Sequence, residues 1–257
     1  MNLPIDLLRT IASEQLGESS SRSLFLTISG AHLYGFASPD SDFDLRGAHV
    51  APLRSVISLA PPRETLEYSD VREGREIDFV SHDVRKFFGL MLKRNGYVME
   101  QVFSPLVVTG GTELEELREL ARACLTRGLH LHYAGFFENQ LGLLTKESPK
   151  RVKTLLYAYR VVLTGIHVLA EIEIESSLPR LLELHPLDRR VSDLIAAKTR
   201  EESTLDEAEL ESHLPLLGTL RARLDEASRT SPLPAEPAGA RALDDFLVRL
   251  RTADLER

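Results

Sequence analysis

Ile28–Gly47, ISGAHLYGFASPDSDFDLRG, is the stretch that decides the fold predicted for this chain. The apolar run Leu24–Ile28 predicts a buried strand that ends just before Gly30. A second strand is predicted to begin at Asp42, and successive side chains of a strand alternate between its two faces. Asp42 and Asp44 therefore point the same way. Two carboxylates on one face repel each other unless a cation lies between them, so the pair indicates a site for a hard divalent ion such as Mg2+.

The segment between these two strands begins at Gly30 and is rich in small residues. We expect a turn and one or two helical turns over Gly30–Phe36, followed by a loop at Ser38–Asp40. Backbone amides that are free at a turn and a helix start form a natural anion site. An amide cradle beside an acidic pair is the layout of a metal-assisted nucleotide site.

A third carboxylate comes from the next alternating segment, Arg75–Val80, with the sequence REIDFV. Its acidic residues Glu76 and Asp78 alternate with apolar side chains, which is typical of a half-buried strand. We interpret this segment as a strand that lies next to the second strand. Asp78 is then expected to come close to the first two aspartates.

Other metal sites are less consistent with the sequence. A calcium-binding loop starting at Asp40 requires Gly at its sixth position and Glu at its twelfth, but Leu45 and Ala51 occupy these positions. A zinc site at His130 and His132 is not expected, because no acidic residue lies nearby at ligand spacing. The single cysteine excludes both an intrachain disulfide and a cysteine-rich zinc site.

The composition is that of an ordinary globular protein, with 257 residues, 43% apolar and 27% charged. The net charge of −8 argues against binding of nucleic acid through a positive charge spread over the whole surface, although a local basic cleft is compatible with it. We see no signal peptide at the start of the sequence, and no apolar run is expected to span a bilayer. A cytoplasmic enzyme or binding protein without a membrane partner is therefore expected.

The second half of the chain has a different pattern from the first. After Thr112 no convincing strand is found, and periodic apolar residues predict successive helices up to a final one near residues 241–253. We predict an α+β fold with a first domain over residues 1–110 and an all-helical C-terminal domain over residues 111–257. A Pro-rich linker is predicted at residues 231–238, and the glycines of Val107–Gly111 suggest the boundary between the domains.

The motifs in the first half resemble a known group of enzymes. Gly30-Ala31, Tyr34-Gly35, the run Ser41–Gly47 with the sequence SDFDLRG, and Asp78 are similar to the motifs of the DNA-polymerase-β-like nucleotidyltransferase superfamily. Within it, the pattern closely resembles the predicted nucleotidyltransferases associated with RNA repair operons. The resemblance covers roughly Leu24–Ser104 well and is weaker in the helical half.

The resemblance implies a small mixed nucleotidyltransferase sheet with flanking helices. It implies transfer of a nucleoside monophosphate from an NTP to an acceptor hydroxyl, with an RNA end or a tRNA as the expected acceptor. Asp42 and Asp44 are implied to bind two Mg2+ ions, for which Mn2+ can substitute. Asp78 is implied to bind the catalytic ion and to orient or deprotonate the acceptor. Three carboxylates with cations suffice for phosphoryl transfer, which needs positioning and charge neutralisation above all.

One position departs from the pattern of the family. The serine of its Gly-Ser motif is Ala31 here, so the backbone amides of Gly30, Ala31 and His32 are left to contact the phosphates. This departure keeps open a nucleotide-binding module that has lost catalytic activity. The acidic net charge keeps open an acceptor other than RNA, such as a protein side chain or a small molecule.

A polar stripe on a predicted helix, Pro149–Glu173, permits two interpretations. Lys153, Tyr157, Arg160 and Thr164 lie on one side of this helix, at i, i+4, i+7 and i+11. They are either a solvated face or one wall of a nucleotide cleft. In the second case Lys153 and Arg160 contact phosphates and Tyr157 stacks on a base.

Arg46 directly follows the acidic motif on the predicted second strand. It is expected to pair either with one of the aspartates or with a phosphate of the nucleotide. The sequence does not distinguish these two partners.

Overall fold

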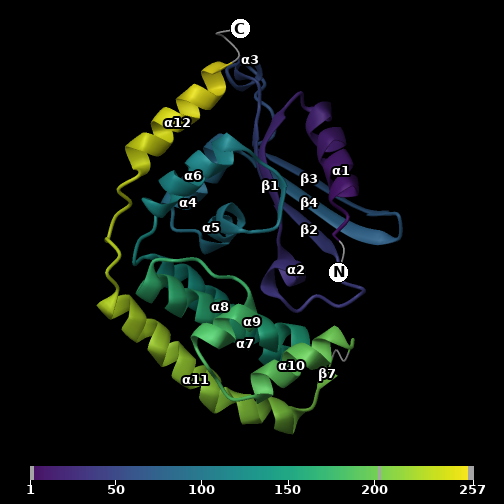
Figure 1. The fold of residues 1–257 in the computed structure, drawn as a ribbon, viewed down its shortest axis with the longest axis vertical. Helices are drawn as coiled ribbons and strands as arrows, with labels where there is room; N and C mark the ends of the chain where they lie inside the picture. Colours follow the sequence, from purple (N-terminus) through teal and green to yellow (C-terminus); the bar gives the residue numbers. More distant parts are fainter. Residues whose placement is uncertain (1–2, 202–203, 254–257) are drawn as a thin grey trace. The chain divides into compact units, whose positions relative to one another are not determined.

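The computed structural model describes residues 3–201 and 204–253, and the chain divides into two compact units (Figure 1). The first unit contains Met1–Gly30, Asp42–Cys124 and Pro237–Arg257, and the second contains Ala31–Ser41 and Leu125–Glu236. These units do not coincide with the predicted ranges 1–110 and 111–257. A C-terminal segment belongs to the first unit, and the segment between the two predicted strands belongs to the second.

The first unit is built on a five-stranded mixed sheet in the order β3-β4-β2-β1-β5. β2 and β4 are parallel, and the other neighbouring pairs are antiparallel. The predicted α+β class with a small mixed sheet is therefore confirmed. The strands are β1 (Arg22–Ile28), β2 (Phe43–Val50), β3 (Thr65–Arg72), β4 (Arg75–Asp83) and β5 (Val107–Thr109). The helices that belong wholly to this unit are α1 (Ile5–Glu18), α3 (Leu53–Val56), α4 (Val84–Leu92), α5 (Gly96–Phe103), α6 (Thr112–Arg122) and α12 (Ala240–Thr252).

The two faces of this sheet are covered by different helices. α1 packs on one face, where Leu8 and Ile11 share a buried core with Leu45 and Phe79 of the central strands. α4 and α5 lie on the opposite side of the sheet (Figure 1). Because strand side chains alternate, the residues next to Leu45 and Phe79, including Asp44, belong to the face that α1 does not cover.

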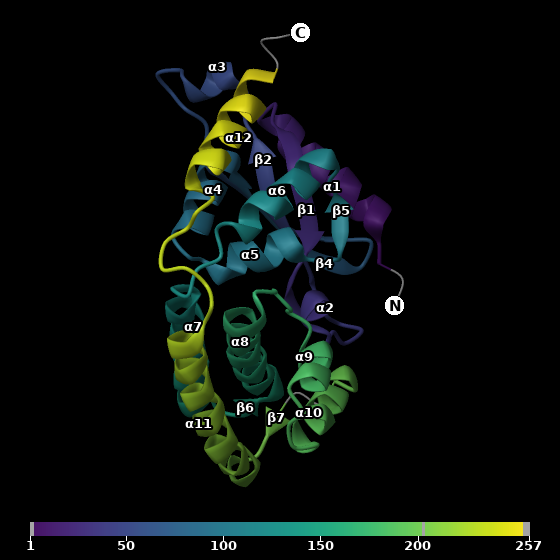
Figure 2. The same cartoon turned by 60° about the vertical axis from the view of Figure 1, so that its left-hand side comes forward.

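β5 and α12 differ from the sequence-based expectations. Val107–Gly111, predicted as a domain boundary, contains β5, an edge strand that pairs with β1. The predicted linker 231–238 connects the second unit to α12, which packs on α4 through stacked rings of Phe88 and Phe246 at 5.8 Å. α12 is therefore part of the αβ unit (Figure 2).

In the part of the second unit that the structure describes, two strands of two residues each accompany the helices. β6 and β7 pair antiparallel, with Lys150 opposite Leu205, so the expectation of an all-helical domain is nearly but not fully met. α8 lies at its centre and packs against α7 and α11. The elements of this unit are α7 (Leu129–Lys146), β6 (Lys150–Arg151), α8 (Val152–Glu171), α9 (Leu178–Leu184), α10 (Arg190–Thr199), β7 (Thr204–Leu205) and α11 (Glu207–Thr230), with most of α2 (Gly30–Tyr34).

α8 corrects one expectation from the sequence. Among the described residues it is the one helix long and apolar enough, by length and composition, to cross a membrane, although no such run was predicted. Of its apolar window, 89% is buried inside the structure. Its apolar side chains therefore have protein partners, as in the core helix of a globular unit.

Acid is expected to destabilise the first unit through His49 on β2. The pKa of His49 is lowered to about 4, mainly by burial; Asp83 opposes this shift, and the charges of Arg251 and His82 add to it. A histidine has a pKa near 6.5 in the unfolded chain, so the unfolded state binds more protons between pH 6.5 and 4. The stabilisation is complete above pH 6.5 and declines as the pH falls to about 4, by roughly 3 kcal/mol.

Denaturant unfolding of the protein and of a His49→Gln variant between pH 7.5 and pH 4 measures this effect. Because glutamine does not titrate, the difference in unfolding free energy between the two proteins should change steeply below pH 6.5. A constant difference across this range would contradict the assignment to His49.

Candidate functional site

Asp44 and Asp78 lie directly opposite each other on the parallel strands β2 and β4. Their carboxylates converge on a single atom: Nη2 of Arg46 donates to Asp44 Oδ1 and to Asp78 Oδ2, each at 2.6 Å. The predicted adjacency of the two strands is therefore confirmed, and the two aspartates form one cluster. Of the two kinds of partner predicted for Arg46, an aspartate or a phosphate, the structure shows the aspartates.

The local sequence explains why these side chains meet. Phe43 and Leu45 are apolar and buried in the core under α1, which places Asp44 and Arg46 together on the other face of β2. Asp78 follows the buried Ile77 in the same way on β4. In-register parallel pairing then brings the two carboxylates side by side.

Arg46 is held in place by more than the two carboxylates. Its Nε donates to the hydroxyl of Tyr97 on α5 at 3.1 Å, and its Nη1 donates to the carbonyl oxygens of Leu45 and Asp78. Burial disfavours its charged form, but Tyr97, Asp44 and Asp78 outweigh this effect and raise the pKa of Arg46. The residue is 8% exposed, so a permanently charged guanidinium lies within the unit.

Gly30 begins the turn beside the two aspartates. Its φ of +62° is in the left-handed region that glycine tolerates best, and the backbone amide of the preceding Ser29 donates to the carbonyl oxygen of Asp44 at 2.8 Å. A Cβ atom at position 30 would lie 1.8 Å from Asp44 Oδ2. The glycine is therefore required for the close approach of this turn to the carboxylate. The predicted helix after it is only five residues long.

Gly30→Ala is expected to disturb the aspartate cluster. The added methyl group collides with Asp44 and also sits at an unfavourable φ, so we expect a loss of more than about 2 kcal/mol in the free energy of unfolding. Gly74→Ala is a matched control, because Gly74 has a φ of +71° with nothing within 4 Å of the Cβ position. This control should lose only about 1 kcal/mol. Equal losses in denaturant unfolding would contradict the collision with Asp44.

Asp42 is less closely integrated than the other two aspartates. It lies immediately before the first residue of β2 and is half-buried. Over residues 3–201 and 204–253, no group of three or more His, Cys, Asp or Glu side chains is arranged to hold a metal ion. The three predicted ligands are therefore not gathered as one set, and Asp42 stays a predicted ligand.

The donor set nevertheless fits one hard divalent ion. Two carboxylate oxygens, from Asp44 and Asp78, already converge on one positively charged nitrogen. Mg2+ is usually bound through one or two carboxylates, with waters and substrate phosphates as the remaining ligands. Asp44 and Asp78 are the residues that would hold such an ion.

The other predicted nucleotide-binding residues belong to the second unit. Ala31 is buried and His32 is half-buried on α2. On α8, Lys153 is exposed, whereas Arg160 and Thr164 are buried. A solvated face is therefore the wrong interpretation for the last two residues of the stripe.

Tyr157 and Arg160 are engaged with aromatic residues of the segment 31–41. The guanidinium of Arg160 lies 4.0 Å from the ring centre of Tyr34, and the Tyr157 ring meets Tyr34 and Phe36 edge-on at 5.4 and 5.6 Å. These contacts hold the segment after Gly30 against α8. Tyr157 and Arg160 thus serve packing within the second unit, and their predicted contacts with a base and a phosphate stay predictions.

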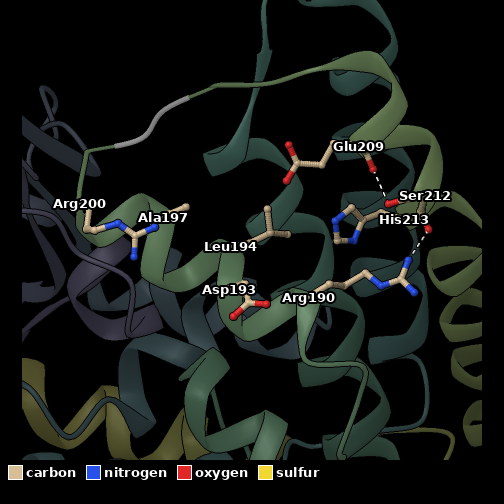
Figure 3. Close-up of a pocket in the computed structure, with 8 residues that line it drawn as sticks. All are labelled: Arg190, Asp193, Leu194, Ala197, Arg200, Glu209, Ser212 and His213. Atoms are coloured by element: carbon tan, nitrogen blue, oxygen red, sulfur yellow. Dashed lines mark hydrogen bonds between the residues drawn. The ribbon is translucent and has the colours of Figure 1, made fainter.

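Two sets of residues were not identified from the sequence. Tyr97 was not among the candidate site residues, and only the three-dimensional structure shows that its hydroxyl supports Arg46. A pocket of about 400 Å³ lies between α10 and α11, where Arg190 donates to the carbonyl oxygen of Ser212 (Figure 3). The buried His213 that lines it bonds to Tyr159. The pocket contains none of the predicted site residues.

A mixed sheet with two facing aspartates beside a glycine turn is the arrangement expected of a nucleotidyltransferase of the polymerase-β type. Residues 5–249 match the RNA repair pathway DNA polymerase beta family, and the chain belongs to this family. The resemblance inferred from the sequence motifs is therefore confirmed.

Two similar proteins can be named. An uncharacterized protein of Methanocaldococcus jannaschii is 30% identical over 218 residues, which cover 84% of this chain and 88% of that protein. A nucleotidyltransferase-like protein from Exiguobacterium sibiricum 255-15 aligns with 98% of this chain and 78% of its own, at 14% identity and a TM-score of 0.33.

Proposed function

We propose that this protein is a divalent-metal-dependent nucleotidyltransferase that moves a nucleoside monophosphate from an NTP to an acceptor hydroxyl. The observation that supports this most directly is the convergence of Asp44 and Asp78 on one cationic atom. Membership of a polymerase-β family agrees with the reaction type. Asp42, at the start of β2, is proposed as a further ligand.

Each of the site residues has its own role in the proposed reaction. Asp44 and Asp78 hold the ion, and Asp78 also accepts or orients the proton of the acceptor hydroxyl. The glycine at position 30 lets the turn approach the Asp44 carboxylate closely, since a Cβ atom there would lie 1.8 Å from Asp44 Oδ2. A bound Mg2+ supplies positive charge that neutralises the phosphates and lowers the pKa of the acceptor hydroxyl. Phosphoryl transfer then requires little covalent chemistry from the protein.

An RNA 3′ end or a tRNA is proposed as the acceptor. The family description refers to an RNA repair pathway, which supports this choice. The net charge of −8 means that RNA must be bound at a local patch and not by the whole surface.

Incubation of the protein with each α-labelled NTP, Mg2+ or Mn2+, and a mixture of RNAs tests the proposal. Label on RNA that depends on the divalent ion is the expected result. Label on protein would instead identify a different acceptor for the same reaction. Calorimetry that detects NTP binding without any transfer would favour a non-catalytic nucleotide-binding module. The absence of both NTP binding and transfer would exclude the proposal.

A further inference from the structure

We propose that Arg46 is the resident cation of the aspartate cluster, and that a divalent ion binds there only by displacing its guanidinium from Asp44 and Asp78. This inference rests on the proposed function, because it concerns the same two carboxylates. It assigns to Arg46 a positioning role that sets how tightly the protein binds metal in the absence of nucleotide.

The contacts of the guanidinium support this role. Both carboxylates bond to the same nitrogen, Nη2, at 2.6 Å. Nη2 occupies the point at which one oxygen of each carboxylate converges, so a divalent ion held between Asp44 and Asp78 would compete with the guanidinium for these oxygens. Charge-assisted bonds of this kind are among the stronger hydrogen bonds in proteins, so the competition is substantial.

Displacement does not require Arg46 to leave the site. A guanidinium has five N–H donors, and all five are used here. Only the two donors of Nη2 go to the carboxylates. The other three go to Tyr97 and to the carbonyl oxygens of Leu45 and Asp78, and they can keep the side chain beside the cluster. Arg46 is then positioned next to the ion, where a phosphate brought in by the nucleotide can replace the lost carboxylate contacts.

Mn2+ binding to the full-length protein, followed by the loss of the free Mn2+ signal in electron paramagnetic resonance, tests the inference without an activity assay. Arg46→Met removes the competing charge and should tighten Mn2+ binding at least tenfold. Arg46→Gln keeps a donor for the carbonyl oxygens and should act in the same direction. Arg46→Lys keeps the positive charge but lacks the planar guanidinium with its paired donors. Its Mn2+ affinity should fall between those of the wild type and Arg46→Met.

A matched control separates competition from general electrostatics. Arg75→Met removes a positive charge from the same strand as Asp78, three residues away, at an exposed position. It should change Mn2+ affinity less than twofold. Asp78→Asn should weaken binding both alone and in the Arg46→Met background, which locates the ion at the cluster.

The outcomes distinguish this inference from the proposed function. Unchanged or weaker Mn2+ affinity in both Arg46→Met and Arg46→Gln would overturn the role of Arg46 while leaving a metal site in place. Absence of Mn2+ binding in every variant and in the wild type would overturn the metal-dependent function itself. If Arg46→Met is unfolded without metal, recovery of its thermal transition on adding Mn2+ supports the inference. If the transition does not recover, and the Mn2+ affinity of Arg46→Gln equals that of the wild type, the inference is contradicted.

Discussion

Asp44→Asn is expected to lower the rate of nucleotidyl transfer at least about a thousandfold, which corresponds to roughly 4 kcal/mol of transition-state stabilisation. Asparagine keeps the shape of the side chain but removes the negative charge that a hard ion needs. Asp44 is one of only two carboxylates that converge at the cluster, so no other described residue replaces it there.

The fold should tolerate this substitution. Asp78 remains to neutralise Arg46, and the amide oxygen of asparagine can still accept one of its hydrogen bonds. We therefore expect the thermal transition to move by only a few degrees. Transfer is measured in single turnover with saturating NTP and Mg2+, which separates the chemical step from product release.

Asp70→Asn provides the matched control for this experiment. Asp70 is an exposed aspartate on β3 that bonds to Tyr68 and Arg72, and because it lies opposite Ile77 it belongs to the other face of the sheet from Asp78. The same chemical change there should alter the transfer rate less than twofold. If Asp44→Asn kept more than a tenth of the wild-type rate, the aspartate cluster would not be the catalytic centre.

Alternation along single strands made part of this site predictable. The apolar residues Leu45 and Ile77 belong to a buried face, so a half-buried strand places Asp44 and Asp78 on the other one. The adjacency of the two strands was also predicted, and the register that sets the carboxylates opposite each other is consistent with it. The sequence left the partner of Arg46 open, because the path of a long side chain depends on the groups around it in three dimensions.

The assignment of segments to the two units could not be read from local patterns. Tyr34 and Phe36 stand in a glycine-containing turn, and nothing in their spacing tells which core will bury them. In the structure they pack with Tyr157 and Arg160, so the segment between β1 and β2 belongs to the helical unit. For the same reason the buried position of Arg160 was not evident from a helical stripe of polar residues.

The packing partner of the C-terminal helix α12 also could not be predicted from the sequence. Its amphipathic pattern predicts a buried face but does not identify the partner of that face. The structure pairs Phe246 with Phe88 of α4, and it pairs Arg251 with Asp83. A linker rich in proline, followed by a helix, is compatible with packing on either unit.

Breaking the Asp83–Arg251 pair is expected to destabilise the first unit strongly. Both side chains are 8% exposed, and Arg251 also donates to the carbonyl oxygen of Ala51. Asp83 is in addition the N-cap of α4 and accepts from the backbone amide of Arg85 at 3.0 Å. Removing one partner leaves the other as a buried, uncompensated charge.

Asp83→Ala should therefore reduce the free energy of unfolding of this unit by about 3–5 kcal/mol, since it removes both the ion pair and the cap. Arg251→Met should cost about 3 kcal/mol, because methionine replaces part of the volume but leaves the carboxylate unpaired. Hydrogen exchange of the peptides that cover α4 and α12 measures these losses within the unit itself. This readout is preferable to a single melting curve, because two compact units need not unfold together.

The double variant Asp83→Ala with Arg251→Met tests whether the two side chains stabilise each other or contribute to packing independently. Without either charge no uncompensated ion remains, so the double variant should be destabilised by clearly less than the sum of the single variants. A coupling energy above about 1 kcal/mol in the double-mutant cycle is expected for groups in direct contact. Strict additivity, or single losses below about 1 kcal/mol, would mean that the ion pair does not hold α12 on the αβ unit and that the stacked rings of Phe88 and Phe246 suffice.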